Sequence, residues 1–173
     1  NNIYNDYDYV NKMVFDGKWT IDEMTRILNE SYKDTDGDGK KSNGDDYGYA
    51  SVGMWGPAIP MLIGLDINFV EKTADSVQFA FNNEHSVAAL DKLHDLYYSE
   101  GTISSLGDVT GLRSFFANKQ VVFMGYNRLG DLAQLRDIEF EMGVLPYPKF
   151  DENQEGYITT LHDTSEIGAI PST

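Results

Sequence analysis

The sequence of 173 residues contains no cysteine, which excludes disulfide bonds, thiolate zinc sites and cysteine nucleophiles. This absence does not decide the compartment, because exported bacterial proteins also do without disulfides. No apolar run approaches the roughly 18 residues that a transmembrane helix requires. The chain begins Asn1-Asn2-Ile3-Tyr4, with neither an initiator methionine nor a signal-peptide pattern, and we therefore expect a piece of a longer protein.

Positive charge is also scarce. Lysine and arginine number 13 against 28 aspartates and glutamates, for a formal net charge of -15. A phosphate backbone binds clustered cations and an anionic membrane repels carboxylates, so this balance argues against nucleic acids and membrane surfaces as partners. Neutral molecules or cations are the expected ligands. Aromatic residues make up 13% of the chain, a share that is compatible with planar ligands although most rings fill cores.

Catalytic patterns are sparse as well. The nucleophile-elbow, zinc-protease, phosphate-loop and dinucleotide-binding motifs are all missing, and the 3 histidines do not predict a zinc site. The pair His162-Asp163 could face a cleft from an extended segment, or could belong to a turn at the end of a strand. A carboxylate pair for glycoside hydrolysis stays an open alternative, because sequence does not give spatial separation. We expect a protein that is not an enzyme.

Helical and strand patterns alternate along the chain without a regular period. Thr20-Ile21-Asp22-Glu23 has the form of a capping box, and the apolar spacing after it predicts a helix to about Tyr32. A second long helix is expected from Asn83 to Glu100, with Val87, Leu90, Leu93 and Tyr97 on its buried side. Shorter helices are expected after Pro57, at 112–118 and at 126–136, and strands at 46–52, 75–81, 120–125 and 140–145, with an extended run at 157–170. This mixture predicts one α/β domain, a mixed sheet flanked by helices.

The most specific local pattern is the loop at 34–45. Oxygen-bearing residues at loop positions 1, 3, 5, 9 and 12, with glycine at position 6, are typical of a calcium loop, which needs hard oxygen ligands and a sharp turn. The predicted ligands are the carboxylates of Asp34, Asp36 and Asp38, the carbonyl of Lys40, then Ser42 and Asp45. Position 12 usually carries Glu, so a bidentate grip by the shorter Asp45 is less assured, and Asp46 could take its place. The alternative is a solvated turn rich in Asp and Gly.

The place of this loop in the chain bears on the role of the expected Ca²⁺. The loop joins a predicted helix to a predicted strand, whereas a sensor pair needs a second helix that opens on binding. We therefore expect the Ca²⁺ to be structural.

Three segments follow one another in an order and spacing that carry a family resemblance. They are DGKWTIDEM at 16–24, which leads into the loop at 34–46, FFANKQVVFM at 115–124 and FEMGVLPYPKFDENQ at 140–154. Together they resemble the extracellular solute-binding proteins of bacterial ABC transporters, in the carbohydrate-binding branch found in Gram-positive bacteria. The chain departs from the family pattern at Asn118, where the family often has glycine.

The resemblance implies a periplasmic-binding-protein type II-like fold, in which two α/β lobes joined by hinge strands close over a ligand. It implies that residues 1–173 form a single domain, the C-terminal lobe of such a protein, with 1–18 and 157–173 near the hinge. The implied partners are a small-molecule solute such as a sugar or oligosaccharide, an ABC permease and the N-terminal lobe. The implied location of the full-length parent is the cell surface, as an extracellular lipoprotein.

The resemblance also implies that loops facing the cleft contact the ligand. Sugar recognition needs an aromatic face for the ring and planar polar groups for the hydroxyls. Residues of these types in the implied segments are Trp55, Tyr126, Asn127, Arg128, His162 and Asp163. The alternative places Trp55 in the core and Arg128 at the surface. A second hypothesis for function is a calcium-stabilised surface interaction or adhesion module.

Overall fold

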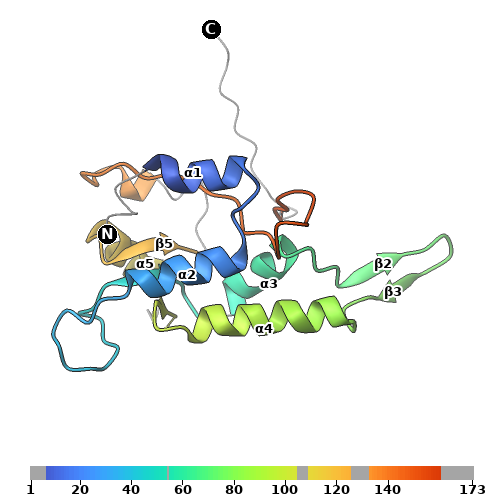
Figure 1. The fold of residues 1–173 in the computed structure, drawn as a ribbon, viewed down its shortest axis with the longest axis horizontal. Coiled ribbons are helices and arrows are strands. Elements are labelled where there is room, and N and C mark those ends of the chain that lie inside the picture. The colour runs from blue at the N-terminus through green and yellow to red at the C-terminus, as the bar shows by residue number, and fades with distance from the viewer. Residues whose placement is uncertain (1–6, 54, 105–108, 126–132, 161–173) are drawn as a thin grey trace, which may run out of the picture.

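The computed structural model of the chain describes residues 7–53, 55–104, 109–125 and 133–160 (Figure 1). The helices among these residues are α1 (Tyr7–Phe15), α2 (Ile21–Ser31), α3 (Trp55–Gly64), α4 (Glu84–Tyr98) and α5 (Val109–Ala117). The strands are β1 (Tyr47–Ala50), β2 (Val70–Lys72), β3 (Val77–Phe79), β4 (Thr102–Ile103) and β5 (Val121–Met124).

A parallel sheet of three strands organises the domain. Its strand order is β4-β1-β5, so that β1 is central and pairs through Tyr49 with Thr102 on one side and with Phe123 on the other. Helix α2 packs on β1 and on α4, and α5 packs on β5. The remaining strands, β2 and β3, form an antiparallel hairpin apart from this sheet (Figure 1). The α/β class and the flanking helices predicted from the sequence are confirmed, but the described sheet is parallel, whereas a mixed sheet was predicted.

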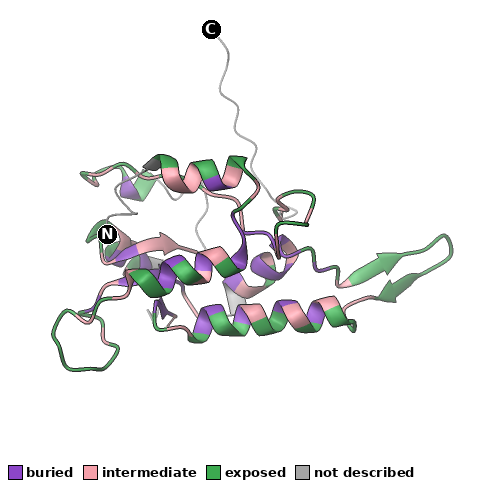
Figure 2. Ribbon diagram, viewed as in Figure 1, coloured by how far each residue is buried: buried purple, intermediate pink, exposed green. Residues whose placement is uncertain are grey.

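The larger core cluster lies among α2, α3, α4 and β1, and a smaller one lies between the sheet and α5 (Figure 2). The apolar stripe of α2 is buried as predicted, and all four of its members are at most 4% exposed: Ile21, Met24, Ile27 and Leu28. The stripe predicted for α4 is partly wrong, because Val87 is 57% and Leu90 41% exposed. Leu93 and Tyr97 are buried as predicted, and the buried side of the helix is completed by Ser86, Ala89 and Leu96.

The capping box predicted before α2 forms only in part. The Thr20 hydroxyl accepts the Glu23 N–H at 3.3 Å, as predicted. The Glu23 carboxylate does not complete the box, since it accepts from the Arg26 guanidinium at 2.5 Å. The helix therefore begins at Ile21 with one of its free N–H groups capped by a side chain.

Other predicted elements differ from the structure. The strand predicted at 140–145 is wrong, because this segment has no strand partner among the described residues. Its Phe140 packs instead on Phe116, with ring centroids 5.5 Å apart. In the helix predicted at 126–136, residues 133–135 form a 3₁₀ turn, and residues 126–132 lie outside the description. In the extended run predicted at 157–170, only 157–160 are described, and they form no strand. No described helix is both long enough and apolar enough to span a membrane.

Candidate functional site

The predicted calcium loop brings three carboxylates together. Within the described residues, Asp34, Asp36 and Asp38 form the one group of three or more acidic or histidine side chains whose ligand atoms all lie within 4.8 Å of one another. Asp34 is half-buried, and the other two are exposed. The loop follows α2 and leads into β1, as the sequence predicted. These three aspartates are half of the predicted ligand set.

Backbone N–H groups of the loop hold the first aspartate in place. Asp34 Oδ1 accepts from the N–H of Gly37 at 2.7 Å, and Oδ2 from the N–H of Gly39 at 2.8 Å. Both glycines have positive φ, of 73° and 72°, a conformation that residues with a Cβ rarely adopt. The hydrogen bond from Gly39 is the largest cause of a lowered pKa at Asp34. The loop is therefore wound around an ionised Asp34.

The pKa of Asp36 is shifted in the opposite direction to that of Asp34. The N–H of Asp38 lowers the pKa of Asp36, but burial and the charges of Asp38 and Asp45 outweigh it, and the pKa is raised. A divalent cation at the three carboxylates would relieve this repulsion. The donor set of hard carboxylate oxygens fits Ca²⁺, which takes six to eight oxygen ligands in flexible geometry.

The other predicted ligands lie outside this group of three carboxylates. Asp45 is fully buried, and its two carboxylate oxygens accept from the N–H of Thr35 at 3.0 Å and of Ser42 at 2.7 Å. It closes the loop from inside and is not part of the three-carboxylate group. Asp46 pairs through its backbone with Lys33 in an antiparallel bridge. The Ser42 hydroxyl accepts the N–H of Gly44 at 3.0 Å, and the Lys40 N–H donates to Asp38 at 2.7 Å.

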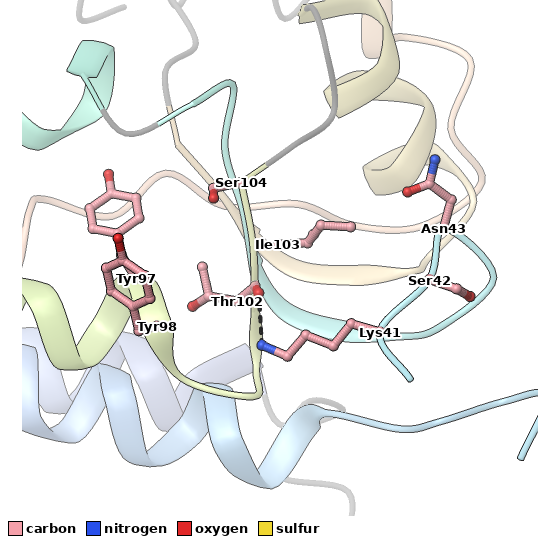
Figure 3. Close-up of a pocket in the computed structure, with 8 residues that line it drawn as sticks. All are labelled: Lys41, Ser42, Asn43, Tyr97, Tyr98, Thr102, Ile103 and Ser104. Carbon is pink, nitrogen blue, oxygen red and sulfur yellow. Dashed lines mark hydrogen bonds between the residues drawn. The ribbon is translucent and has the colours of Figure 1, made fainter. Parts of the chain in front are cut away.

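A pocket of about 300 Å³ lies between the loop and the C-terminal end of α4 (Figure 3). Its wall includes Tyr97, Tyr98 and Thr102, and the Lys41 side chain reaches along it. The Lys41 ammonium donates to the carbonyl of Ser99 at 2.5 Å and to that of Thr102 at 3.4 Å. Burial is the main cause of its lowered pKa. Lys41 thus ties the loop to the end of α4, where carbonyl groups attract a cation.

The carboxyl ends of the three parallel strands meet at one edge of the sheet. Ala50, which ends β1, is in register with Ile103 of β4 and with Met124 of β5. Hydrogen bonds continue beyond the strands: the Gly125 N–H donates to Ala50 at 3.0 Å, and the Gly53 N–H to the carbonyl of Ser104 at 3.0 Å. The segments after β1, β4 and β5 therefore start side by side. In open α/β sheets, ligands bind outside this edge.

The predicted ligand-contacting residues follow two of these strand ends. Trp55 begins α3, five residues after the end of β1, and its side chain is not described. Tyr126, Asn127 and Arg128 begin two residues after the end of β5 and lie outside the described residues, as do His162 and Asp163. The ends of β1 and β5 are adjacent, so the segments toward Trp55 and toward Tyr126 begin at the same edge of the sheet.

The sequence did not point to the buried hydroxyls beneath this edge. The rings of Tyr49 and Tyr97 meet edge to face with centroids 6.1 Å apart. Neither hydroxyl has a hydrogen-bond partner within the described part of the chain. Burial raises the pKa of Tyr97 to about 12 and that of Tyr49 well above its ordinary value. The alternation of Tyr47 and Tyr49 in a predicted strand was the available signal, but it does not reveal that the ring of Tyr97 on α4 packs against Tyr49.

The described histidines hold structural contacts. His85 is hydrogen-bonded through Nε2 to the carbonyl of Leu65 at 3.0 Å, and its ring meets Phe150 at 4.5 Å between centroids. The exposed ring of His94 stacks on Tyr98 at 4.4 Å. Neither joins a group of metal-ligating side chains within the described residues.

Comparisons of the chain with protein-family models, curated proteins and solved structures return no significant match. The resemblance to solute-binding proteins therefore rests on the sequence segments named above. Two of these segments lie against each other in the structure. Thr20 and Lys149 form a parallel bridge, in which the Lys149 N–H donates to Trp19 at 3.0 Å and the Ile21 N–H donates to Lys149 at 2.9 Å.

Proposed function

We propose that this chain is the ligand-binding lobe of a cell-surface solute receptor that serves an ABC transporter, and that its solute is a carbohydrate. The proposal rests on the pairing of Ala50 with Met124 at the ends of β1 and β5. Because of this pairing, the segments that lead to Trp55 and to Tyr126 leave the parallel sheet at the same edge. Loops at this edge are where α/β sheets bind small molecules. The receptor does no chemistry on its solute.

The chemistry of the residues after β1 and β5 supports a sugar as the solute. An indole such as Trp55 stacks on the C–H face of a pyranose, and Tyr126 adds a second ring. Asn127 offers both donors and acceptors to hydroxyls, and Arg128 offers a planar fork of donors. His162 and Asp163 complete the set from the C-terminal segment. A net charge of -15 favours such a neutral solute over an anionic one.

The proposal includes a second lobe, which closes over the solute and supplies the other half of the contacts. Segments 1–18 and 157–173 approach the hinge in this arrangement. The parent protein is an extracellular lipoprotein that delivers the solute to a permease. A hydrogen bond at the start of segment 157–173 supports this arrangement. The Tyr157 hydroxyl accepts the Trp19 N–H at 3.3 Å, which holds the start of this segment against the body of the domain.

Ca²⁺ has a structural role in this proposal. Asp34, Asp36 and Asp38 bind the ion through carboxylates, and the carbonyl of Lys40 and the Ser42 side chain add further oxygens. The ion would neutralise the clustered charge and fix the connection from α2 to β1. Asp45 holds the base of the loop through the N–H groups of Thr35 and Ser42, and its remaining lone pairs can face the ion.

A second candidate function is a calcium-stabilised interaction module. The exposed apolar hairpin of β2 and β3 favours it, since contiguous exposed apolar side chains mark interaction surfaces. The two candidates differ in the surface that carries the function: the carboxyl edge of the sheet for the receptor lobe, and the hairpin for the module.

Titration of the chain with a panel of neutral oligosaccharides, followed by saturation-transfer NMR and calorimetry, tests the receptor hypothesis. We expect millimolar binding, because one lobe offers half of the contacts. Trp55→Ala, Asn127→Ala and Arg128→Ala should each abolish the signal. Asn118→Ala, an amide substitution at the opposite end of β5, is the matched control and should leave it unchanged. Micromolar affinity of the chain alone, or binding insensitive to the three substitutions, would overturn the proposal.

A further inference from the structure

Asn43 is followed by Gly44 in the loop at 34–45, and this is the one Asn-Gly pair in the sequence. The side-chain amide carbon of an asparagine lies within reach of the next backbone nitrogen, and a glycine there places no Cβ beside that nitrogen. Attack of the nitrogen on the amide carbon closes a cyclic imide and releases ammonia. The pair therefore carries the groups for a self-modification, and the fold determines whether those groups are held.

The main chain of this pair is fixed, whereas the side-chain amide is not. The carbonyl of Asn43 accepts from the Gln120 side chain at 3.1 Å, and the carbonyl of Gly44 accepts from the Thr35 hydroxyl at 2.5 Å. Figure 3 shows the Asn43 carboxamide well apart from the Lys41 ammonium, and no hydrogen bond from the described residues holds it. Both residues of the pair are exposed, so water reaches the amide.

The N–H of Gly44 is bound to a side chain that can turn away from it. It donates to the Ser42 hydroxyl at 3.0 Å. Rotation about the Cα–Cβ bond of Ser42 to another staggered position releases this N–H without any movement of the main chain. The attacking nitrogen is therefore available in the folded loop.

Three Asp-Gly pairs can form the same cyclic imide, and the structure holds each of them, at 16–17, 36–37 and 38–39. The N–H groups of Gly37 and Gly39 donate to the two carboxylate oxygens of Asp34 at 2.7 and 2.8 Å. The Gly17 N–H donates to the carbonyl of Val14 at 3.1 Å. Their release requires the ionised Asp34 or the end of α1 to move, and a carboxylate is a poorer electrophile than an amide. The structure thus separates the Asn-Gly pair from these three.

We propose that Asn43 is a site of spontaneous deamidation in the folded chain. The Gly44 nitrogen bonds to Cγ of Asn43, the bond from Cγ to Nδ2 breaks, and the Gly44 amide proton leaves with the NH₂ group as ammonia. One water molecule then opens the cyclic imide. Opening at Cγ gives aspartate, and opening at the main-chain carbonyl carbon gives isoaspartate, in which the main chain runs through the side chain and is one carbon longer.

The two products differ in their effect on the base of the loop. The Asp45 N–H donates to the carbonyl of Ser42 at 3.3 Å, and the Ser42 N–H donates to the Asp45 carboxylate at 2.7 Å. An extra main-chain carbon at position 43 lies inside this turn and displaces Ser42 from Asp45. The buried Asp45 also accepts the Thr35 N–H at 3.0 Å, so isoaspartate loosens both ends of the loop. Aspartate keeps the main chain and only adds one negative charge.

Peptide mapping of the intact folded chain by mass spectrometry, during prolonged incubation at neutral pH, tests the proposal. We expect the mass gain of an amide-to-acid conversion at Asn43, with isoaspartate detected there by enzymatic methylation and absent from the three Asp-Gly pairs. Asn118 and Asn153 are exposed and precede larger residues, so they are internal controls and should stay unchanged. In urea Asp34 releases the two glycines, and isoaspartate should then also form at 36–37 and 38–39.

Two variants separate the reaction from its consequence. Gly44→Ala adds a Cβ beside the attacking nitrogen and should slow the reaction at least about tenfold, equal to about 1.4 kcal/mol in the barrier. Its nearest neighbour would be the Ser42 hydroxyl at 3.3 Å, which can rotate. Asn43→Asp reproduces the aspartate product with a normal main chain and should melt as the wild type does, whereas the purified isoaspartate fraction should melt at a lower temperature.

Two results would overturn the assignment of the site: an intact Asn43 in the folded chain under conditions that deamidate it in urea, or equal isoaspartate formation at 36–37 or 38–39 in the folded chain. An unchanged rate in Gly44→Ala would contradict attack by the Gly44 nitrogen. An isoaspartate fraction that melts with the wild type would contradict the effect on the base of the loop.

Discussion

The indole N–H of Trp19 donates to the carbonyl oxygen of Pro146 at 3.0 Å and joins two segments that are 127 residues apart in the chain. Trp19 is 2% exposed, and its ring contacts Phe123 of β5 with centroids 5.4 Å apart. The segment that follows Pro146 also contacts α3, because the Gln154 side chain donates to the carbonyl of Gly64 at 2.9 Å. One buried indole thus couples the start of α2 to the sheet and to the C-terminal segment.

Replacement of Trp19 by Phe should destabilise the domain by about 1–3 kcal/mol. The smaller ring keeps much of the packing, but it leaves space where the indole was and removes the donor to the half-buried carbonyl of Pro146, and the two losses together cost about that much. Urea unfolding followed by circular dichroism measures the change without relying on the altered fluorophore. A midpoint equal to that of the wild type would show that the hydrogen bond to Pro146 does not stabilise the fold.

Gly48 and Gly101 allow α2 to lie directly on the sheet. A Cβ at Gly48 would lie 2.3 Å from the Cα of Leu28, and one at Gly101 would lie 2.0 Å from the Leu28 carbonyl oxygen. Because these neighbours are backbone atoms, the helix itself would have to move. We expect Gly48→Ala and Gly101→Ala each to cost about 3 kcal/mol or more.

Gly156→Ala is the control for these two substitutions, since a Cβ there meets nothing within 4 Å. Thermal and urea unfolding should place this variant near the wild type and well above the other two. Equal stability of all three variants would contradict the close approach of α2 to the sheet.

Ca²⁺ should stabilise the folded chain. At a free concentration of about 100 times Kd, an ion that binds only the folded state adds about 2.7 kcal/mol, and EDTA should remove this gain. Asp36→Asn keeps an oxygen for the N–H of Asp38 but removes one charge, so it should abolish the response to calcium. Asp91→Asn, at an exposed position of α4, should respond as the wild type does. Identical melting temperatures in calcium and in EDTA would show that Ca²⁺ does not stabilise the fold.

Stability should fall steeply at alkaline pH. Burial raises the pKa of Tyr97 to about 12, above the value of about 10 for an unfolded tyrosine. The folded state therefore holds the phenolic proton more tightly, and its advantage is complete below about pH 10 and is lost as the pH rises toward 12.

Tyr97→Phe isolates this contribution. It removes a buried hydroxyl that has no partner among the described residues, so stability at neutral pH should change by less than about 1 kcal/mol. The alkaline loss measured by urea unfolding should become shallower, whereas Tyr98→Phe, at a ring 66% exposed, should follow the wild-type curve. A Tyr97→Phe curve that coincides with that of the wild type would contradict the assignment.

Sequence patterns predicted the elements that are determined locally. The Thr20 cap and the apolar spacing after it predicted α2, and the glycines and aspartates of the loop predicted the group at Asp34, because turn chemistry and carboxylate spacing lie within a few residues. Strand β4 was missed, since Thr102–Ile103 becomes a strand only through its pairing with β1. The strand expected at 140–145 failed for the converse reason: alternation without a neighbouring strand does not make a sheet.

The candidate ligand site at the carboxyl edge of the sheet also depends on contacts between residues far apart in the sequence. The sequence proposed Trp55 and Arg128 through a family resemblance, but it contained no information that the ends of β1 and β5 are adjacent. That adjacency comes from the pairing of Tyr49 with Phe123 and of Ala50 with Met124. The burial of Asp45 could not be predicted either, because it depends on how the loop closes over Tyr47, whose hydroxyl donates to the carbonyl of Ser42 at 2.9 Å.

If the carboxyl edge of the parallel sheet binds the solute, backbone-amide NMR during an oligosaccharide titration will detect it there. We expect concentration-dependent shifts at Gly53, Ser104 and Gly125, while Tyr47 and Gln120 at the opposite ends of β1 and β5 stay unchanged. Shifts confined to those opposite ends or to the hairpin, or no shift with any neutral oligosaccharide at millimolar concentration, would contradict it.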